Sequence, residues 1–247
     1  MAIPTFSAEL VWRRQETPRV LHLGFRRADG GALDYVAGQF VNLHFDTGEG
    51  GTHRSYSIAN PPGDDAGVFE IAMTPVAGGL ATEALMGLGE GDALPVSGPY
   101  GRFVLRDDPP CRYVLVGTGT GITPYRAMLP ELRHRLAHGY RAHVVLGVWS
   151  RDEALFGADF QALAHEDPRF EYTACYSRTV PVDAGPGERK GYVQAAYDAL
   201  GLDPAADVVY LCGNPAMIDE SVDALKAQGF DLRQLRREKY VSARPAR

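Results

Sequence analysis

Two patterns of apolar and polar residues follow one another along the chain. In the first hundred residues, short runs alternate apolar with polar positions, as half-buried strands do, and turn residues such as Asp29-Gly30 separate them. The predicted strands are residues 20–25, 40–45, 52–59 and 68–73, and one helix is predicted at residues 80–86. Several short strands at this spacing predict a small antiparallel β-barrel, which we assign to residues 1–106.

The pattern changes at residues 106–110, where two acidic residues precede two prolines. This composition cannot continue a strand ladder and predicts a linker. Beyond it, the predicted strands are residues 113–116, 142–149, 170–176 and 208–212, and the predicted helices are residues 124–138, 156–165, 193–200 and 216–227. Apolar strands that alternate with helices predict an α/β domain with a parallel sheet covered on both faces, which we assign to residues 111–247.

A glycine-rich stretch follows the first strand of the predicted α/β domain. Residues 117–124 read Gly-Thr-Gly-Thr-Gly-Ile-Thr-Pro, and this spacing differs from the usual G-x-G-x-x-G fingerprint of dinucleotide sites. Free backbone N–H groups at such a turn can bind a diphosphate, although an ordinary strand-to-helix turn is the alternative. The candidate ligands are Gly117, Thr118, Gly119, Thr120, Gly121 and Thr123.

A second candidate site lies on the predicted strand at residues 52–59. Alternation places Arg54 and Tyr56 on one side of this strand and Ser55 and Ser57 on the other. An arginine can bind a phosphate with two N–H groups, a tyrosine ring can stack on a flat heterocycle, and a serine can hydrogen-bond to a ring nitrogen. The alternative is a barrel strand with a surface ion pair and a core tyrosine.

Two further motifs lie in the first part of the chain. One ends a strand and opens a helix, so that free N–H groups and a threonine hydroxyl could bind an anion. Its residues are Gly78, Gly79, Leu80, Ala81 and Thr82. The other, Gly-Pro-Tyr-Gly at residues 98–101, predicts a tight turn between strands.

These motifs, followed by Cys-Gly-Asn-Pro at residues 212–215, occur in one order along the chain. In that order they resemble the ferredoxin–NADP⁺ reductase family, in particular its bacterial branch, over nearly the whole length. The resemblance implies a barrel that binds FAD and a second domain that binds NADP(H). It further implies that Arg54 and Thr82 hold the FAD diphosphate, that Tyr56 stacks on the isoalloxazine, and that Ser57 hydrogen-bonds near N5.

Two arginines are candidates for selecting NADP(H). Arg151 and Arg178 each follow a predicted strand, and two convergent guanidinium groups at that sheet edge suit a 2′-phosphate. An ordinary charged loop that includes Asp152 is the alternative. Related bacterial enzymes often carry a basic residue where Gly191-Tyr192 stands here, so either Arg189 or Lys190 replaces it or the preference for NADPH is weaker.

The resemblance also assigns roles near the end of the chain. It places Cys212 beside the nicotinamide ring, with Gly213 and Asn214 binding the nucleotide, whereas the alternative is that Cys212 only fills a buried slot. Glu238-Lys-Tyr240 resembles a family terminus in which the aromatic ring covers the flavin. Glu238 could then relay a proton, or it is a surface carboxylate. Residues 241–247 continue beyond this motif, either along the adenosine half of FAD or as a silent tail.

Together these features predict hydride transfer between NADPH and FAD, followed by single-electron transfer to ferredoxin or flavodoxin. Three alternatives stay open: an NADH-dependent flavin or cytochrome reductase, an electron-transfer subunit of a larger complex, and a non-enzymatic flavoprotein that senses a ligand. The expected docking is transient and electrostatic. The basic residues proposed for it are Arg233, Arg236, Arg237, Lys239 and Arg244.

Composition excludes several other classes of protein. The chain is 45% hydrophobic and 23% charged, with no apolar run long enough to cross a bilayer, so we expect a globular protein with no membrane contact. An odd number of widely spaced cysteines suits a reducing cytoplasm, and the family resemblance implies a monomer. The net charge of −6 argues against nucleic acid. Three widely spaced cysteines cannot form an all-cysteine, four-ligand metal site, and His134 and His138 lack a third ligand, so no metal is expected.

Overall fold

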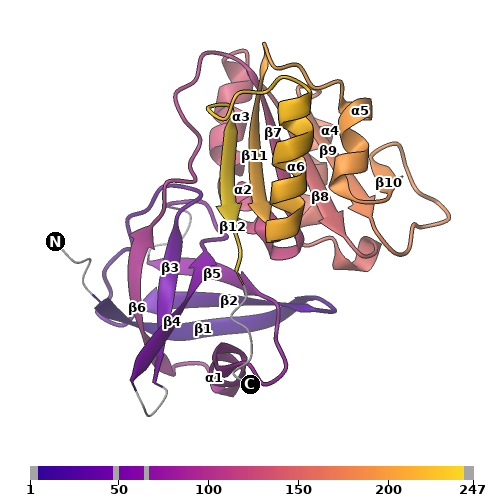
Figure 1. The fold of residues 1–247 in the computed structure, drawn as a ribbon. Coiled ribbons are helices and arrows are strands. Elements are labelled where there is room, and N and C mark those ends of the chain that lie inside the picture. Colours follow the sequence, from indigo (N-terminus) through magenta and orange to yellow (C-terminus); the bar gives the residue numbers. More distant parts are fainter. Residues whose placement is uncertain (1–4, 47–49, 64–66, 242–247) are drawn as a thin grey trace. The chain divides into compact units, whose positions relative to one another are not determined.

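The computed structural model describes residues 5–46, 50–63 and 67–241, which form two compact units divided between Leu105 and Arg106 (Figure 1). The C-terminal extension at residues 242–247, with Arg244 and the predicted course along FAD, lies outside the described residues. No helix in these described ranges combines the length and the apolar character needed to cross a bilayer.

The first unit is an antiparallel barrel, as the strand pattern predicts. Its strands are β1 (Thr5–Thr17), β2 (Val20–Arg27), β3 (Phe40–Asp46), β4 (Gly51–Ser57), β5 (Val68–Met73) and β6 (Ala93–Tyr100). They form one sheet in the order β4-β3-β6-β1-β2-β5. Directly after β4, Ile58 bridges Ile71 of β5, and the Ala59 N–H donates to the Glu70 carbonyl at 2.7 Å. The two edges of the sheet therefore meet, and the barrel closes.

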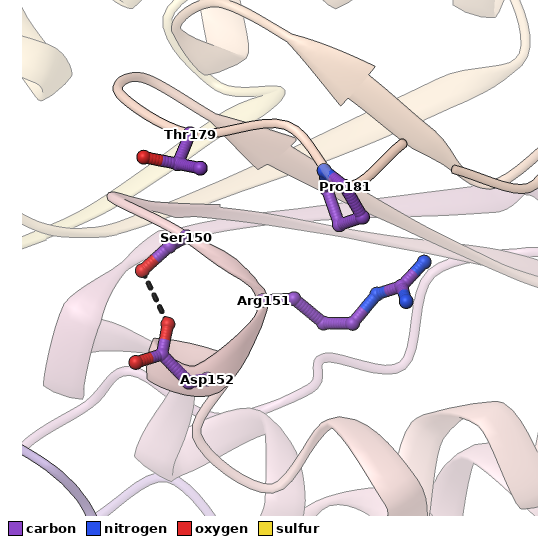
Figure 2. A pocket seen from close by; sticks show the side chains of 5 residues that line it. All are labelled: Ser150, Arg151, Asp152, Thr179 and Pro181. Atoms are coloured by element: carbon purple, nitrogen blue, oxygen red, sulfur yellow. Dashed lines mark hydrogen bonds between the residues drawn. The ribbon is translucent and has the colours of Figure 1, made fainter. Parts of the chain in front are cut away.

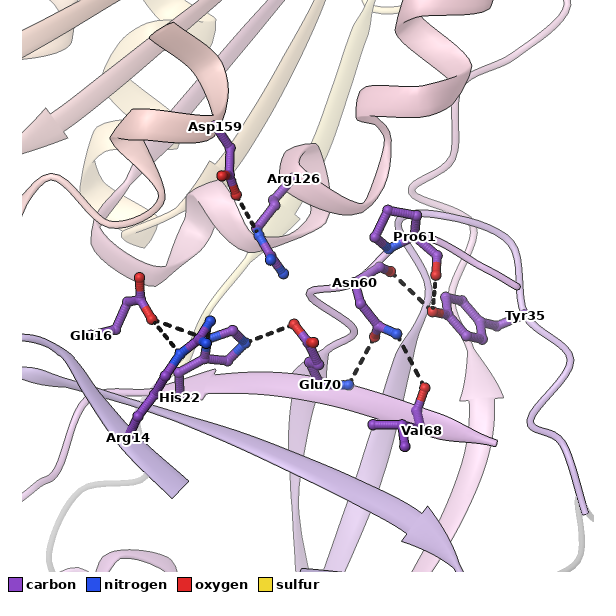
Figure 3. A network of polar contacts seen from close by, with 10 residues as sticks. All are labelled: Arg14, Glu16, His22, Tyr35, Asn60, Pro61, Val68, Glu70, Arg126 and Asp159. Atoms are coloured by element: carbon purple, nitrogen blue, oxygen red, sulfur yellow. Dashed lines mark hydrogen bonds and ion pairs between the residues drawn. The ribbon is translucent and has the colours of Figure 1, made fainter. Parts of the chain in front are cut away.

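Buried polar side chains reinforce this closure (Figure 3). The Asn60 amide donates to the Val68 carbonyl at 3.1 Å and accepts the Glu70 N–H at 2.8 Å, so one side chain fastens the segment after β4 to β5. His22 is fully buried on β2, and its Nε2 lies 2.9 Å from the Glu70 carboxylate. These groups are satisfied by one another, as buried polar groups in a stable fold must be.

The barrel interior is filled by alternate strand residues and by the helix α1 (Leu80–Gly87), whose Leu85 is fully buried. The fully buried side chains include Leu23, Phe25, Val41, Leu43, Ile58, Phe69, Ile71 and Val96. Burying one such side chain contributes about 1.5–3 kcal/mol, so this core is the main source of the unit's stability.

The turn predicted at residues 98–101 is wrong, because Gly98 to Tyr100 form the end of β6. Between β3 and β6 the register shifts: Asn42 pairs with Ser97, whereas Phe40 pairs with Tyr100. Between these pairs, one residue of β3, Val41, opposes two residues of β6, Gly98 and Pro99, which is a β-bulge. Gly98 has φ +147°, and a Cβ there would lie 3.1 Å from Val41, so glycine is needed at the bulge; the peptide bond before Pro99 is cis.

The second unit is built on a parallel sheet, again as predicted. Its strands are β7 (Arg112–Thr118), β8 (Arg141–Val148), β9 (Phe170–Tyr176), β10 (Glu188–Lys190), β11 (Asp207–Gly213) and β12 (Leu235–Lys239). The order is β10-β9-β8-β7-β11-β12, with every pair parallel. The direction of winding reverses beside β7, and ligands of such sheets bind at the carboxyl ends of the strands next to this reversal.

Helices cover both faces of this sheet (Figure 1). They are α2 (Thr123–Ala127), α3 (Leu129–Ala137), α4 (Gly157–Glu166), α5 (Tyr197–Leu200) and α6 (Pro215–Ala227). Short 3-10 turns occur at Gly119–Ile122, Arg151–Glu153 and Val193–Ala196. On the face under α5 and α6, Val116 and Leu211 of the sheet pack in one cluster with Ile218 and Leu225 of α6. The other face lies against α2, α3 and α4.

Two predicted helices differ in detail. The helix predicted at residues 124–138 is broken at Met128, because Pro130 has no N–H for the bond that a continuous helix would make there. The helix predicted at residues 193–200 begins as a 3-10 turn. The strands β10 and β12 were not predicted, since one has three residues and the other has a single apolar residue, Leu235.

A buried ion pair joins β7 to β11. Arg112 Nε donates to Asp207 Oδ1 at 2.9 Å, and the other Asp207 oxygen accepts the Asp203 N–H at 2.8 Å. Asp207 is 2% exposed, so removing its charge leaves a nearly buried guanidinium without its partner.

We therefore expect Asp207→Asn to lower the free energy of unfolding by about 2 kcal/mol in urea denaturation. The matched control is Glu166→Gln, which breaks the exposed pair with Arg133 and should cost less than about 0.5 kcal/mol. Equal costs for the two variants would contradict a structural role of the buried pair.

Candidate functional site

The first candidate site lies on β4 of the barrel. In register, Arg54 faces Leu43 and Tyr56 faces Val41 of β3, so both side chains lie on the face that carries the barrel core. Both are half-buried, and Tyr56 packs against the core. Ser55 is exposed on the other face, where its hydroxyl donates to Asn42 at 2.7 Å. The alternation predicted from the sequence is therefore present.

The chemistry of these side chains suits a flat anionic ligand. Arg54 Nη1 donates to the Thr52 hydroxyl at 3.1 Å and to the His53 carbonyl at 2.7 Å, which orients the guanidinium. No carboxylate among the described residues pairs with Arg54, so its charge is available to an anion. Burial raises the pKa of Tyr56 to about 12, which keeps its phenol neutral. Ser57 is buried at 5% exposure, beside this pair on the chain.

The second part of this site is the N-terminus of α1. Gly78 has φ +67° and turns the chain into the helix, and the Gly79 carbonyl accepts the first helical bond, from Glu83 at 3.0 Å. The N–H groups of Leu80, Ala81 and Thr82 therefore have no acceptor within the helix. Such groups bind phosphate readily, since the helix dipole adds to their field.

Thr82 has a structural bond as well. Its hydroxyl oxygen accepts the Val76 N–H at 2.8 Å, which holds the loop before the helix, and its own O–H can still donate to a ligand. Tyr56, Leu80 and Ala81 all pack at the margin of the same barrel core. The structure thus places both parts of the predicted FAD site on one core, although Arg54 and Thr82 have separate partners.

In the second unit, the glycine-rich stretch does not lead directly into a helix. Gly119 has φ +53°, which turns the chain into a 3-10 turn at Gly119–Ile122, and α2 begins only at Thr123. Nothing lies within 4 Å of the position that a Gly119 Cβ would take, so the tip of the loop is open. Thr120 is half-buried beside it.

This loop lies tightly against the loop after β11. A Cβ on Gly121 would overlap the Cys212 carbonyl oxygen and would be 2.7 Å from Gly213 Cα. A Cβ on Gly213, at φ +117°, would be 2.7 Å from the Thr118 hydroxyl. A Cβ on Gly117 would lie 3.0 Å from the Gly121 carbonyl oxygen. Gly121 and Gly213 are therefore required for the two loops to touch, whereas Gly117 lets the first loop turn closely on itself.

Hydrogen bonds join the same two loops. The Thr118 hydroxyl accepts the Asn214 N–H at 3.0 Å. The Asn214 side chain in turn caps α6 by accepting the N–H groups of Ala216 at 2.8 Å and Met217 at 3.3 Å. The two loops that the sequence assigned to a nucleotide site in this unit, residues 117–123 and 212–214, are thus brought together.

One buried polar atom of this region has no partner. Thr123 is 2% exposed, and no hydrogen bond from the described residues reaches its hydroxyl. Buried hydroxyls are nearly always satisfied, and since this oxygen has no exposed surface, a buried water rather than an external ligand would complete its bonding. The two touching loops are the part of this region that fits a nucleotide diphosphate.

Cys212, Glu238 and Tyr240 also come together. Glu238 of β12 pairs in register with Cys212 of β11, and the Tyr240 N–H donates to the Gly213 carbonyl at 2.8 Å. Cys212 is fully buried, and its thiol has a side-chain hydrogen bond with Tyr240. Burial, with Glu238 nearby, raises the pKa of Cys212 well above the ordinary value. The thiol is therefore protonated and neutral at physiological pH, which makes it a poor nucleophile.

The two predicted selectivity arginines have different surroundings. Arg151 Nε donates to Glu188 at 2.8 Å and its Nη1 donates to Asp183 at 2.9 Å, so two carboxylates hold it. Arg178 is exposed, and its Cζ lies 3.3 Å from the centroid of the Trp149 ring. The guanidinium groups thus do not share a partner.

Arg151 lines a shallow hollow of about 420 Å³ (Figure 2). Ser150 and Asp152 lie on the turn that carries Arg151, and Thr179 and Pro181 lie on the facing segment. Sequence reasoning missed Glu188 and Asp183, the two partners of Arg151. No pattern pointed to them, because they lie in a segment rich in turn residues and in a strand of only three residues.

We expect Gly121→Ala to lower the free energy of unfolding by about 1–3 kcal/mol, since the new methyl group must push the two loops apart. Gly119→Asn is the control within the same loop, because asparagine tolerates positive φ and the space there is open. It should change the free energy of unfolding by less than about 0.5 kcal/mol in the same urea titration. A harmless Gly121→Ala would show that the loops can separate freely.

We also expect the free energy of unfolding to fall as the pH rises above about 9. Burial raises the pKa of Cys212 well above 9.0 and that of Cys175 to about 11. The unfolded chain loses these protons first and so binds fewer protons than the folded chain, which makes the slope negative. Cys212→Ser, followed by urea unfolding at several pH values, should make this slope shallower by up to about 1.4 kcal/mol per pH unit. An unchanged slope would contradict the burial of that thiol.

Comparison with known proteins agrees with this geometry. Residues 12–105 match the oxidoreductase FAD-binding domain, and residues 115–223 match the oxidoreductase NAD-binding domain. Ferredoxin–NADP reductase B of Sorangium cellulosum is 37% identical over 222 residues, which are 86% of this chain and 88% of that protein. The electron transfer component of toluate 1,2-dioxygenase from Pseudomonas putida is 32% identical over 93% of this chain and 66% of its own length. Several other curated relatives are matched over only about 60% of their length.

A solved structure shows the same fold. The ferredoxin NADP⁺ reductase from Neisseria gonorrhoeae, with bound FAD and NADP, superposes with a TM-score of 0.81 at 22% identity, over 95% of this chain and 98% of that one. Both the order of the motifs and the length of the match to the Sorangium protein point the same way. The chain belongs to the ferredoxin–NADP⁺ reductase family of oxidoreductases, with an FAD-binding and an NAD-binding domain.

Proposed function

We propose that the protein is an FAD-dependent reductase that takes electrons from NADPH and passes them singly to a separate ferredoxin or flavodoxin. The observation that carries this proposal is the pair of touching loops after β7 and β11, where Gly121 and Gly213 bring a nucleotide-binding loop against Cys212 and Tyr240. That arrangement supports a nicotinamide nucleotide whose diphosphate lies on the first loop and whose reactive end lies at the second.

FAD, when bound, would supply the conversion between two-electron and one-electron transfer. The chain's own residues would bind FAD and orient its ring. Arg54 and the free N–H groups at Leu80, Ala81 and Thr82 would hold the flavin diphosphate, and the neutral ring of Tyr56 offers a flat surface for stacking. Ser57 is a candidate hydrogen-bond partner for the flavin ring.

In the second unit, the residues that we expect near the nicotinamide ring are a neutral thiol, Cys212, and two half-buried side chains, Tyr240 and Glu238. The Cys212 thiol is neutral and small, which permits close approach of a planar ring to the β11 backbone. Tyr240 is half-buried and hydrogen-bonded to Cys212, so its ring has a defined position. Glu238 is half-buried beside them and is the carboxylate we propose for any proton transfer.

Of the basic residues proposed for docking, Arg233 pairs with Asp231, and Lys239 pairs with Asp219 at 2.6 Å. Arg236 donates to the Arg233 carbonyl. Arg237 is exposed, and no carboxylate in the described ranges pairs with it. These internal pairs weaken the basic face, so a docking contact there would depend on few free charges.

A second candidate function has support of its own. The toluate dioxygenase relative and a second relative, the reductase component of phenol 2-monooxygenase, are components of oxygenase systems by name, and Arg151 is already held by two carboxylates. An NAD(P)H-dependent reductase that delivers electrons to an oxygenase or a cytochrome would have the same fold. The acceptor distinguishes the two.

The experiment is an anaerobic visible-light titration of the FAD-reconstituted protein with NADPH and with NADH, followed by addition of ferredoxin or flavodoxin. We expect NADPH to bleach the flavin band and ferredoxin or flavodoxin to restore it in one-electron steps. Arg54→Ala should weaken FAD binding about tenfold, because one charge-assisted phosphate contact is lost. Arg133→Ala, at an exposed pair in the other unit, is the control.

The absence of a flavin band after reconstitution would overturn the first site and the function with it. Bleaching without transfer to ferredoxin or flavodoxin, together with transfer to a cytochrome or an oxygenase component, would favour the second candidate.

A further inference from the structure

One cation at the carboxyl edge of the second sheet is held by two anions. Arg151 forms a two-bond fork with Glu188, Nε to Oε1 at 2.8 Å and Nη2 to Oε2 at 2.6 Å, and its Nη1 lies 2.9 and 3.1 Å from the two Asp183 oxygens. The local charge of the three side chains is therefore negative, although the sequence position of Arg151 alone suggests a positive site.

Glu188 is fixed from several directions. The Tyr176 hydroxyl donates to its Oε1 at 2.6 Å, and the Gly185 N–H donates to its Oε2 at 2.9 Å. The Glu188 side chain is 14% exposed, whereas that of Asp183 is 79% exposed. The fork with Arg151, supported by the bonds from Tyr176 and Gly185, holds the pKa of Glu188 down at about 2, so its charge persists at any physiological pH.

The cluster lies where a nucleotide would place its adenosine ribose. β8 pairs with β7 up to Gly147 and Thr118, so the turn with Arg151 follows the strand next to the glycine-rich loop. Arg151 lines the hollow between this turn and the segment with Thr179 and Pro181 (Figure 2). In sheets of this kind, the ligand extends from the glycine loop to the ends of the neighbouring strands.

We propose that Glu188 and Asp183 determine the choice between NADPH and NADH. Both carboxylates pair with Arg151, the cation that would otherwise bind a 2′-phosphate. A 2′-phosphate must either displace the fork or approach two carboxylates, whereas a free 2′-hydroxyl can donate to a carboxylate. Arg178 stacks on Trp149 and pairs with no carboxylate of the described residues, so it carries what preference for NADPH there is. This inference rests on the proposed binding of a nicotinamide nucleotide to the second unit.

The test uses two fragments that differ by the 2′-phosphate, 2′,5′-ADP and 5′-AMP, with affinities measured by calorimetry on the full chain. Glu188→Gln should strengthen 2′,5′-ADP binding about fivefold and leave 5′-AMP within about twofold, since it frees Arg151. Asp183→Asn, an exposed change that spares the fold, should act in the same direction. Glu166→Gln removes one charge elsewhere in the unit and should alter neither affinity.

A double-mutant cycle tests whether Glu188 affects 2′,5′-ADP binding through Arg151. Arg151→Ala alone should weaken 2′,5′-ADP binding by about two- to fivefold, because it leaves Glu188 and Asp183 without a cation beside the phosphate. In the Arg151→Ala background, Glu188→Gln should give a gain of at most about twofold, since it removes one repelling charge but frees no guanidinium. A gain of about fivefold that persists without Arg151, an equal gain in Glu166→Gln, or unchanged or undetectable 2′,5′-ADP binding in both carboxylate variants would overturn the inference.

Flavin reduction separates this inference from the proposed function. If NADPH or NADH bleaches the flavin of every variant while the fragment affinities do not respond, the reductase stands and the specificity role of Glu188 and Asp183 fails. If neither nucleotide bleaches the flavin of the unaltered protein and neither fragment binds, both proposals fail.

Discussion

The nucleotide-binding unit depends on the contact between two backbones. The loops after β7 and β11 touch at Gly121 and Gly213, where a single methyl group would already overlap the neighbouring chain. This contact fixes the Thr118–Asn214 hydrogen bond, the start of α6 and the position of Cys212. Because packed protein is dense, such a contact has few alternative arrangements. The geometry at the carboxyl edge of the sheet follows from it.

The two arginines at this edge of the sheet have different electrostatic surroundings. Arg178 is held by an aromatic ring and Arg151 by two carboxylates, so two chemically identical side chains that follow the neighbouring strands β8 and β9 present different fields to a ligand. A guanidinium that pairs with one carboxylate through two parallel bonds is strongly oriented. Its availability to a third anion then depends on partners from a separate segment of the chain, which is why residue type alone is a poor guide here.

Much of the fold could be predicted from the sequence, because its signals are local. Strands such as β7 (Arg112–Thr118) contain a continuous apolar run, and the glycine and proline clusters mark where the strands end. The missed features are not local. The bulge at Gly98 depends on the register between β6 and β3. β12 has one apolar residue and forms because β11 offers an edge for pairing. Glu188 pairs with Arg151 although the two residues are 37 positions apart in the sequence. Likewise, the residues of the nucleotide loops were identified by motif, whereas the unsatisfied hydroxyl of Thr123 is visible only in three dimensions.

The ends of the two sheets have a consequence for association between molecules. An open strand edge is a template on which another chain can add a strand. The barrel removes both of its edges through the bridge between Ile58 and Ile71. The parallel sheet keeps two edges, β10 and β12, but they are short and read Glu-Arg-Lys and Leu-Arg-Arg-Glu-Lys. A strand that added to either edge would have to bury these charges, so the charged residues protect the folded protein against edge-to-edge aggregation. The same charged residues are the reason that the apolar pattern does not predict these two strands.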